Sequence, residues 1–454
     1  MLKRKIYTEI ENFYKDNPQK ALMITGARQV GKSYIIEQFG KAHYESLIVI
    51  DFINNPEYVE IFSGCNSSDE IMLRISSLFG DRLIEGRTLI FFDEVQRCRE
   101  IITQIKYLVS ETAYSYILSG SLLGTVLRNI SSVPVGYMSI IRMYPLDFEE
   151  FAMANGVGSA VFSKLRSCFE SKEPVDAFLH KRLISLYELY LIVGGMPAAV
   201  STYLESNNLR AVADEQLSII SLYKEDISQY DEDEKLYLND IFELIPSELN
   251  AKNKRFILKD LHGYTKFEKY HNSFLWLQNA GVALPVYCAD EPKIPLKLSK
   301  STTLFKLFMN DIGLLAAMYG NGIQLHILNH ETNINFGSIY ENVAAQELAA
   351  HGYDLYYYNS KKMGELDFLI ENGNEIIPIE IKSGKDYYRH AALENILSCS
   401  EYDIREGMVF CNGNIETVDR ITYYPIYMLM FLEKKSLPDK LVFKSDFSDI
   451  NMLV

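Results

Sequence analysis

The stretch at residues 21–33, ALMITGARQVGKS, decides the fold of the N-terminal part of this chain. It opens with a short apolar run that is typical of a buried strand, and the residues that follow it, Tyr34 to Phe39, have the amphipathic spacing of a helix. Between the two, Gly26-x-x-x-x-Gly31-Lys32-Ser33 has the spacing of a phosphate-binding loop. The alternative is a chance match in a glycine turn, and the strand-then-helix context favours the loop.

The residue types of this loop suit the binding of phosphate. Glycines let the backbone turn so that several N–H groups point at one phosphate chain, and the start of the following helix adds its positive dipole end. We expect Lys32 to reach the β- and γ-phosphates and the Ser33 hydroxyl to ligate Mg²⁺. The sequence therefore predicts a nucleotide and Mg²⁺ site built by Gly26, Ala27, Arg28, Gln29, Val30, Gly31, Lys32 and Ser33.

Two further strand patterns end in polar residues. The apolar run at residues 88–92 is followed by Asp93 and Glu94, which we expect to support the Mg²⁺ shell and to polarise the attacking water, respectively. The alternative for these acids is a solvated helix cap. The run at residues 114–118 ends at Ser119, which either contacts the γ-phosphate or water or forms a simple turn. Alternating strands and helices predict a parallel sheet with its ligand at the carboxyl ends of the strands.

Four motifs together resemble the AAA+-like ATPase family of bacteria and archaea, whose C-terminal region is uncharacterised. They are GARQVGKS at residues 26–33, FFDEVQR at 91–97, LSGS at 118–121 and MYPLDFEEF at 143–151. The resemblance implies an ATPase that uses ATP and Mg²⁺, with Lys32 and Glu94 as its catalytic residues. It also implies an arginine after Gly136 that stabilises charge in the transition state, but this chain has Tyr137 there. That role would then fall to Arg128, to Arg142 or to another subunit. Capping-box spacing predicts that a helix begins at about Asp147.

Composition argues against a secreted protein, a membrane-spanning protein and one drawn to nucleic acid by its overall charge. The chain has 454 residues, of which 48% are hydrophobic and 23% charged, with a formal net charge of −15, so the whole molecule is not drawn to nucleic acid. The six cysteines are widely spaced and predict buried thiols in a reducing compartment. No secretory signal and no long apolar run is found, which predicts a cytoplasmic protein without a membrane partner.

The middle of the chain is helical and then locally basic. Residues 151–235 have the helical periodicity of a lid, with Gly194, Gly195 and Pro197 setting a turn. Between residues 251 and 306 there are ten lysines and arginines against four acids. Three helical patterns and two strand patterns there predict a winged helix that contacts DNA, or one used only for packing or protein contact. The helices are expected at Tyr237–Ile245, Arg255–Leu261 and Lys266–Ala280, and the strands at Val282–Cys288 and Ile294–Ser299.

The C-terminal part carries a hairpin pattern with acids on one face. Two strand patterns, residues 365–370 and 376–382, flank Asn372-Gly373, a strong hairpin signal. If these two residues form the turn, Glu371 pairs with Asn374 and Glu365 lies opposite Glu380. Period-two alternation then places one polar set on one face and one apolar set on the core face. The polar set is Glu365, Asp367, Glu380 and Lys382, and the apolar set is Leu366, Phe368, Ile370, Ile377, Ile379 and Ile381.

This hairpin, with a preceding helix at Ile339–Ala349 that carries Glu341, resembles the PD-(D/E)xK nuclease fold. The resemblance implies that Asp367 and Glu380 hold a divalent metal ion and that Glu341 and Lys382 complete the site. The alternative is a charged solvent face on which Lys382 bridges Glu365 or Glu380. Pro378 fits only an edge or a bulge, which leaves the register open.

These observations predict an α/β protein with a P-loop NTPase parallel sheet. The expected divisions are a core at 1–150, a helical lid at 151–235, a winged-helix-like domain at 236–325 and a PD-(D/E)xK-like domain at 326–454. The leading hypothesis is a Mg²⁺-dependent ATPase coupled to DNA, able to form homo-oligomers. The alternatives are a nucleotide-gated DNA-binding switch with negligible turnover and an ATP-regulated, metal-dependent endonuclease.

Overall fold

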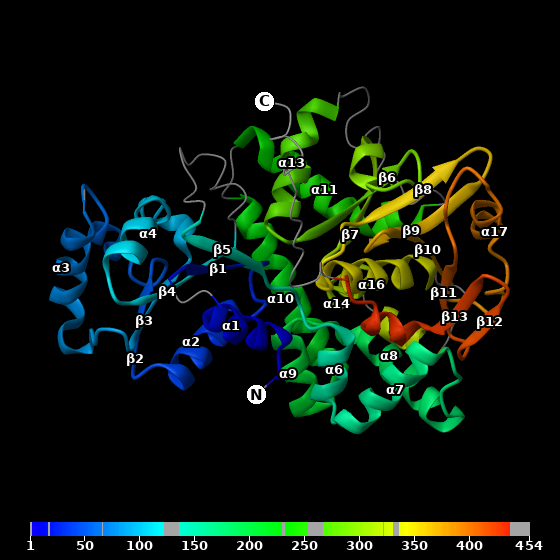
Figure 1. Cartoon of the computed structure of the whole chain (residues 1–454), viewed down its shortest axis with the longest axis horizontal. Helices are drawn as coiled ribbons and strands as arrows, with labels where there is room; N and C mark the ends of the chain where they lie inside the picture. Colours follow the sequence, from blue (N-terminus) through cyan, green and yellow to red (C-terminus); the bar gives the residue numbers. More distant parts are fainter. Residues whose placement is uncertain are drawn as a thin grey trace, which may run out of the picture.

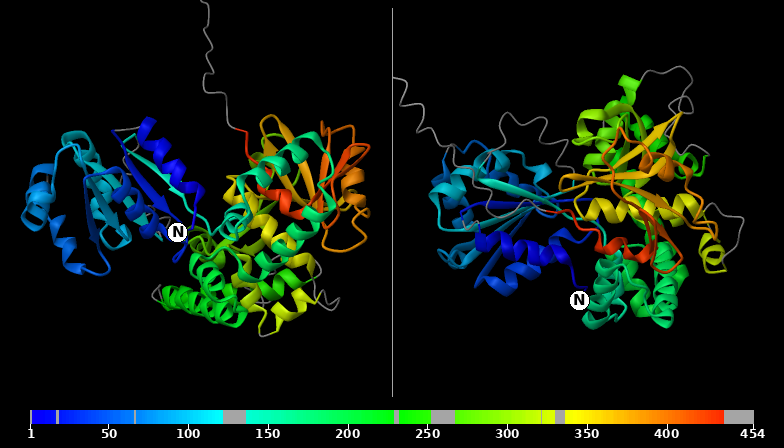
Figure 2. Two further views of the ribbon diagram at one scale, coloured as in Figure 1. Left: turned by 90° about the horizontal axis from the view of Figure 1, so that it is seen from below. Right: turned by 45° about the vertical axis from the view of Figure 1, so that its right-hand side comes forward.

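The chain folds around two β-sheets joined by a layer of helices. The computed structural model describes residues 2–16, 19–65, 67–121, 136–228, 232–251, 267–320, 322–329 and 336–435. The N-terminal sheet lies at one end of the molecule and the C-terminal sheet at the other, with helices α6 to α11 between and below them (Figure 1). Two further views show the same separation of the sheets (Figure 2).

The N-terminal sheet has five strands in the order β2-β3-β4-β1-β5, and every neighbouring pair is parallel. Its strands are β1 (Ala21–Thr25), β2 (Ser46–Asp51), β3 (Thr88–Asp93), β4 (Ser115–Gly120) and β5 (Met138–Arg142). Helices α1 (Lys5–Asp16) and α2 (Lys32–His43) cover one face, and α3 (Ser68–Phe79) and α4 (Glu100–Glu111) cover the other. Short 3-10 turns are η1 (Pro56–Ile61), η2 (Gly80–Arg82) and η3 (Val95–Arg97). The predicted P-loop NTPase sheet is confirmed.

The helical layer follows β5. It comprises α6 (Phe148–Ala154), α7 (Ser159–Ser171), α8 (Ala177–Val193), α9 (Pro197–Ser206), α10 (Leu209–Ser228), α11 (Glu232–Asn250) and α13 (Phe267–Asn279). The predicted capping box is present, because Asp147 accepts from the Glu150 backbone N–H and the Glu150 side chain accepts from the Asp147 backbone. Gly195 is required by a close approach, since a Cβ there would lie 2.0 Å from the carbonyl oxygen of Leu146.

The C-terminal sheet has eight strands in the order β12-β13-β11-β10-β9-β8-β6-β7. They are β6 (Ala283–Ala289), β7 (Lys300–Met309), β8 (Tyr356–Ser360), β9 (Gly364–Asn372), β10 (Glu375–Ile381), β11 (Gly407–Cys411), β12 (Glu416–Val418) and β13 (Ile421–Pro425). The helices are α14 (Ile312–Met318), α15 (Ile323–Leu328), α16 (Phe336–Ala350) and α17 (Ala391–Leu397), with 3-10 turns η4 (Leu296–Ser299) and η5 (Ile426–Phe431).

The segment expected as a separate winged helix differs from the structure. Residues 294–299, predicted as a strand, form a loop and the turn η4, and the strand that pairs with β6 is β7. This β6–β7 hairpin does not stand alone as a wing, because β6 also pairs with β8 and so extends the C-terminal sheet. The predicted helix at 255–261 lies outside the described residues. The predicted boundaries at 150/151, 235/236 and 325/326 fall inside helices α6, α11 and α15.

The predicted register of the β9–β10 hairpin is wrong by two residues. Glu371 pairs with Ile376 rather than Asn374, so the turn is formed by Gly373 and Asn374. A slip of two keeps each side chain of β10 on its predicted face, because the period of a strand is two. The pairing of β8 with β9 has an irregularity at this point, and Leu366 packs in a different apolar cluster from Phe368. Leu366 is therefore not on the face predicted for it.

One apolar cluster runs through most of the molecule. It includes Leu22 and Phe91 under the N-terminal sheet, Tyr190 in the helical layer, and Val343 and Ile379 in the C-terminal part. Two smaller clusters pack on the outer faces of the two sheets, beneath α3 and α4 and beneath α17. The two halves are therefore held together by a continuous core.

Candidate functional site

The phosphate loop connects β1 to α2 at the carboxyl edge of the N-terminal sheet. Gly26 has a φ of +148°, and a Cβ there would lie 2.2 Å from the carbonyl oxygen of Met143, so this position requires glycine. Gly31 caps α2 with a φ of 95°, and Gln29 is also left-handed, with a φ of 68°. The loop thus has the tight turns that the sequence motif predicts.

Lys32 is 4% exposed and folds back over this loop. Its Nζ donates hydrogen bonds to the carbonyl oxygens of Gly26 at 3.1 Å and Ala27 at 2.9 Å. Burial lowers the pKa of Lys32, and the nearby carboxylates of Glu94 and Asp93 act in the opposite direction. The ammonium group is therefore held inside the loop by neutral backbone acceptors.

The acids at the end of β3 lie beside the loop. Asp93 is 6% exposed and accepts hydrogen bonds from the hydroxyls of Ser119 and Ser33. Burial raises the pKa of Asp93, and these two hydrogen bonds lower it in part. The Glu94 backbone N–H donates to Ser119 Oγ at 3.3 Å, while Ser121 Oγ donates to the Glu94 carboxylate at 3.2 Å. The five residues predicted to act on the γ-phosphate, water or Mg²⁺ thus lie at one edge of the sheet: Lys32, Ser33, Asp93, Glu94 and Ser119.

The helical layer touches the phosphate loop through α10 and through the residue after α13, contacts that the sequence did not predict. Arg28 Nη1 lies 2.5 Å from Asp226 Oδ1 of α10, and the Tyr223 hydroxyl donates to the Arg28 carbonyl at 3.1 Å. Gly281, after α13, lies so close to the loop that an added Cβ would be 2.9 Å from Ala27 N. Only the tertiary structure reveals these contacts, because residues 223–281 are distant in the sequence.

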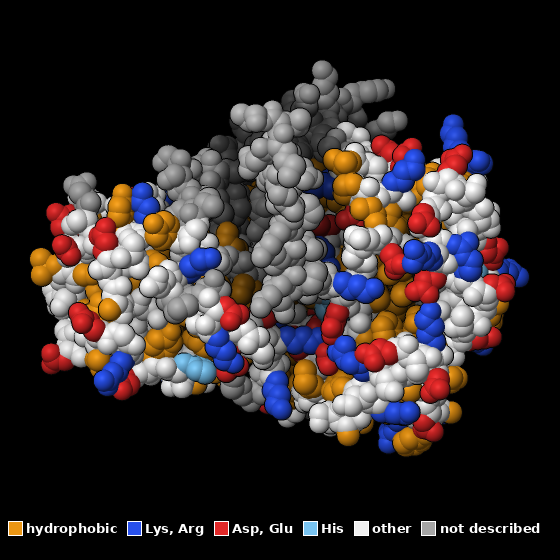
Figure 3. Space-filling view, in the orientation of Figure 1, with side chains coloured by type: hydrophobic (Ala, Val, Ile, Leu, Met, Phe, Trp, Pro, Cys, Tyr) orange, Lys and Arg blue, Asp and Glu red, His pale blue; other side chains and the backbone are white. Residues whose placement is uncertain are grey.

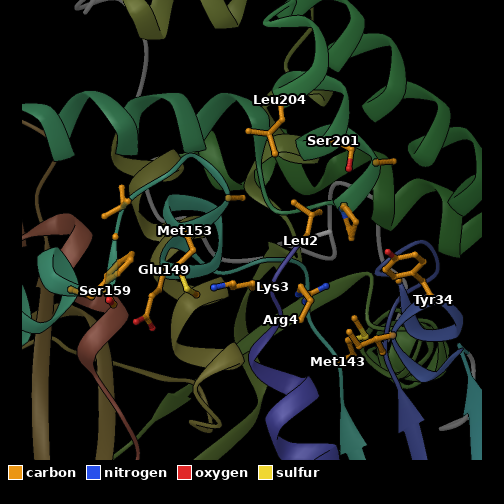
Figure 4. A pocket seen from close by; sticks show the side chains of 18 of the residues that line it. Leu2, Lys3, Arg4, Tyr34, Met143, Glu149, Met153, Ser159, Ser201 and Leu204 are labelled. Atoms are coloured by element: carbon orange, nitrogen blue, oxygen red, sulfur yellow. The ribbon is translucent and has the colours of Figure 1, made fainter. Parts of the chain in front are cut away.

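A cavity of about 1040 Å³ opens beside the start of α2. Leu2, Lys3 and Arg4 pass between Tyr34 and Met143 on one side and Glu149 on the other (Figure 4). Met153, Ser159, Ser201 and Leu204 from the helical layer complete the walls shown there. Arg4 connects this cavity to the loop, since its Nη1 donates to the Val30 carbonyl at 3.1 Å. The sequence carries no short motif for this cavity.

A second polar site lies in the C-terminal half, in a pocket of about 370 Å³. Its lining includes all five predicted residues: Glu341, Glu365, Asp367, Glu380 and Lys382. Asp367 Oδ2 accepts from the Ile381 N–H at 2.9 Å, and Lys382 Nζ lies 3.6 Å from Glu380 Oε1. Burial and then the neighbouring Asp367 raise the pKa of Glu380 well above its usual range. The acids therefore converge despite the register error.

Lys306 of β7 also belongs to this cluster and was missed as a member. It is 1% exposed, and its Nζ lies 3.0 Å from Glu365 Oε1 and 3.4 Å from Glu341 Oε2. Burial lowers the pKa of Lys306, but the carboxylates of Glu341, Asp367 and Glu365 raise it above the usual range. The sequence places Lys306 in the basic stretch predicted to contact DNA, but the structure buries it among acids.

The rest of that basic stretch is only partly described. Lys252, Lys254, Arg255, Lys259 and Lys266 lie outside the described residues, as does Arg128, one of the candidate arginines. Of the others, Lys293 pairs with Glu291, and Lys300 Nζ lies over the Tyr287 ring. Basic and acidic side chains are interspersed over the C-terminal half on the face in Figure 3. Arg142, the other candidate arginine, donates to the Gln278 carbonyl at 2.8 Å.

Three family models match successive parts of the chain. Residues 18–152 match a family described as AAA domain. Residues 184–325 and 336–429 match two domains of unknown function, DUF8612 and DUF4143, respectively. No curated protein matches the chain. The five-stranded parallel sheet and its glycine loop show a P-loop NTPase fold, and residues 18–152 of it are similar to the AAA domain.

Several solved structures are similar at low identity. The Walker-type ATPase PABY2304 of Pyrococcus abyssi is 13% identical over 70% of this chain and 96% of its own, with a TM-score of 0.44. Cdc6p from Pyrobaculum aerophilum is 11% identical over 72% and 94%, with a TM-score of 0.28. The Orc1 protein of Aeropyrum pernix, solved in complex with DNA, is 12% identical over 71% and 93%, with a TM-score of 0.27. In the described part of the chain, no helix has the length and apolarity needed to span a membrane.

Proposed function

We propose that this chain binds ATP with Mg²⁺ at the loop of residues 26–33 and hydrolyses it. The observation that carries the proposal is the convergence of Lys32, Ser33, Asp93 and Ser119 at the carboxyl ends of β1, β3 and β4. In open parallel sheets, ligands bind at this edge. The AAA-domain match over residues 18–152 supports the same activity.

The donor set suits the metal as well as the nucleotide. A hydroxyl from Ser33 and a carboxylate from Asp93, already hydrogen-bonded to each other, are hard oxygen ligands of the kind that Mg²⁺ prefers. When bound, Mg²⁺ neutralises charge on the phosphates. Lys32 would exchange its two carbonyl acceptors for phosphate oxygens, and the loop N–H groups would orient the phosphate chain. Glu94 would accept the proton of the attacking water, and Ser119 would hold Asp93 in place.

The cavity beside α2 is the proposed site of the nucleoside. It contains Gly31 and Tyr34, which immediately flank the phosphate-binding residues Lys32 and Ser33. Its size, about 1040 Å³, lies at the upper end of the range for small-molecule pockets. Side chains of the helical layer, among them Met153 and Ser201, line the cavity too, so the nucleotide would contact both the core and the helices.

Equilibrium binding of ATP by the Lys32→Ala variant tests this proposal. Lys32→Ala removes the ammonium that meets the phosphates, and we expect affinity to fall by at least about 100-fold, the loss of one to two charge-assisted contacts. Lys41→Ala is the matched control, because Lys41 lies on the same helix, pairs with Glu37 at the surface and should leave affinity unchanged. Equal affinity of the Lys32→Ala and wild-type proteins would contradict the proposal.

The proposal extends to DNA and to further copies of the chain as partners. The basic stretch of residues 252–300 supports DNA contact, and the lack of an arginine after Gly136 supports a contribution from a second subunit. Stimulation of ATP turnover by DNA tests the first partner. Dependence of the turnover rate per chain on protein concentration tests the second. A protein that binds ATP and DNA without turnover would be the nucleotide-gated switch instead.

A second candidate activity is metal-dependent cleavage of nucleic acid in the C-terminal pocket. It is favoured by the convergence of Glu341, Asp367, Glu380 and Lys382, because carboxylates that share a pocket can hold Mg²⁺ against a scissile phosphate. We expect any Mg²⁺-dependent nuclease activity to disappear in Asp367→Asn. Asp354→Asn, at an exposed carboxylate near Lys434, is the control. Cleavage that persists unchanged in Asp367→Asn would refute this candidate.

A further inference from the structure

Three side chains of metal-ligand type meet at the contact between the two halves of the molecule. Asp147 precedes α6, Glu347 lies in the last turn of α16, and His351 directly follows the last residue of that helix. One ligand atom from each lies within 4.8 Å of the other two. This cluster is separate from the phosphate loop and from the C-terminal acid pocket.

Within the described ranges, two of these ligand atoms are buried without a hydrogen bond of ordinary length. Glu347 is 0% exposed and uses only one carboxylate oxygen, Oε1, which accepts from the Phe148 N–H at 2.7 Å and the Tyr190 hydroxyl at 3.4 Å. Among the described residues, Glu347 Oε2 and Nε2 of His351, whose side chain is 7% exposed, have no hydrogen bond of ordinary length and make only longer ion-pair contacts with each other and with Asp147. Buried polar atoms without partners are costly and rare, so both atoms call for a ligand in the space between them.

The distances suit a single ion in that space. His351 Nε2 lies 3.6 Å from Asp147 Oδ2 and 3.9 Å from Glu347 Oε2. These separations exceed those of ordinary hydrogen bonds. Ligand atoms bound tetrahedrally to one ion at about 2.0–2.2 Å are separated by about 3.4 Å, so a small inward movement would complete the site.

The local charge points to a divalent cation. Lys5 Nζ lies 2.7 Å from Asp147 Oδ2 and 2.6 Å from Glu149, and Arg4 pairs with Glu150 at 3.1 Å. The second lone pair of Asp147 Oδ2 is still available to an ion. A bound ion requires neutral His351 and ionised carboxylates, and in that state two cations face four carboxylates, with a formal excess charge of −2. The four carboxylates are those of Asp147, Glu149, Glu150 and Glu347.

We propose that Asp147, Glu347 and His351 bind one divalent transition-metal ion, of which Zn²⁺ is the representative. One imidazole nitrogen and two carboxylate oxygens are ligands that Zn²⁺ accepts, and a water molecule can supply the fourth. The ion would link the start of α6, which follows the ATPase core, to α16 of the C-terminal half. Its role is to fix the two halves, and it does not depend on whether ATP is hydrolysed.

Zinc content and binding by the full-length chain test this site. After removal of metals with a chelator, the wild type should take up one more equivalent of Zn²⁺ than Glu347→Gln, measured by calorimetric titration and by elemental analysis after dialysis. Glu347→Gln keeps an oxygen acceptor for the Phe148 N–H and replaces the free oxygen by an amide nitrogen, a poor ligand. Zn²⁺ should also raise the thermal midpoint of the wild type but not that of the variant.

A matched control separates this site from surface binding. His43 Nε2 and Glu11 Oε1 form another histidine–carboxylate pair, 3.3 Å apart and partly exposed, so Glu11→Gln should bind Zn²⁺ as the wild type does. His351→Ala should lose the same equivalent as Glu347→Gln, and circular dichroism reports whether each variant is folded. A wild type that takes up no Zn²⁺, or a folded Glu347→Gln protein that binds as much as the wild type, would overturn the proposal.

Discussion

Two buried lysines distinguish the N-terminal site from the C-terminal pocket. Lys32 is held by the neutral carbonyls of Gly26 and Ala27, and burial lowers its pKa. Lys306 is held by the carboxylates of Glu341 and Glu365, and its pKa is raised. The comparison teaches that a buried lysine bonded only to neutral acceptors is prepared for an incoming anion, whereas one that is already ion-paired serves the fold.

The largest effect on stability should come from Lys306. Lys306→Ala removes the lysine of a buried ion pair with the 3%-exposed Glu341, and removing one partner of a buried pair costs about 3–5 kcal/mol of unfolding free energy. Denaturant unfolding measures this loss. Lys300→Ala, on the same strand but beside Tyr287, is the control and should lose about 1 kcal/mol or less. If Lys306→Ala lost only about 1 kcal/mol, as expected for Lys300→Ala, the distinction drawn between Lys306 and Lys32 would be contradicted.

The close contact of Gly281 with the phosphate loop should give the next effect. Gly281→Ala adds a Cβ 2.9 Å from Ala27 N at a φ of +72°, and we expect a loss of about 1–3 kcal/mol in unfolding free energy. Gly320→Ala is the matched control, because its φ is +95° and no atom of the described residues lies within 4 Å of its added Cβ. A greater loss in Gly281→Ala than in Gly320→Ala measures the contact alone, and equal losses would mean that the contact contributes nothing.

The carboxylate of Asp226 in the wild type should lower the affinity of the loop for ATP. Its carboxylate holds Arg28 of the loop and carries the same charge as the incoming phosphates, so Asp226→Asn should raise the affinity for ATP. The pair is partly exposed, and a change of about 1 kcal/mol, or about fivefold in Kd, is the expected scale. Asp214→Asn on the same helix, which affects the exposed pair with Arg210, should leave Kd unchanged. A decrease in affinity in Asp226→Asn would reverse the assignment.

The smallest expected change is the stability of Lys32→Met. Its two hydrogen bonds are to neutral carbonyls, and removal of a buried ammonium offsets their loss, so the unfolding free energy should change by about 1 kcal/mol or less. The same denaturant experiment as for Lys306→Ala measures it. A loss as large as that of Lys306→Ala would show that Lys32, too, serves the fold.

The sequence predicted what short, contiguous patterns determine. The phosphate loop, the acids after β3, Ser119 and the capping box at Asp147 all depend on residues a few positions apart or on strand ends that a parallel sheet brings to one edge. The convergence of Asp367 with Glu380 was also predictable, because a register slip of two keeps strand faces unchanged.

What the sequence did not predict depends on contacts between distant segments. The strand predicted at 294–299 was wrong, and the β6–β7 hairpin extends a larger sheet because β6 pairs with β8, about 70 residues further along the chain, a partner that hairpin patterns do not specify. Lys306, Asp226 and Gly281 reach their sites only through tertiary packing. Leu366 was assigned to the wrong face because an irregularity in β9 pairing leaves no signal in the pattern of apolar residues.

The proposed role of Glu94 as general base is tested by hydrolysis of ATP with Mg²⁺, measured for the purified wild type and for the Glu94→Gln variant. We predict turnover by the wild type and a fall of about 10²–10⁴-fold in kcat in Glu94→Gln, because a general base is lost while Lys32 still holds the phosphates. ATP affinity should stay the same in the two proteins. Turnover that Glu94→Gln leaves unchanged would contradict the account.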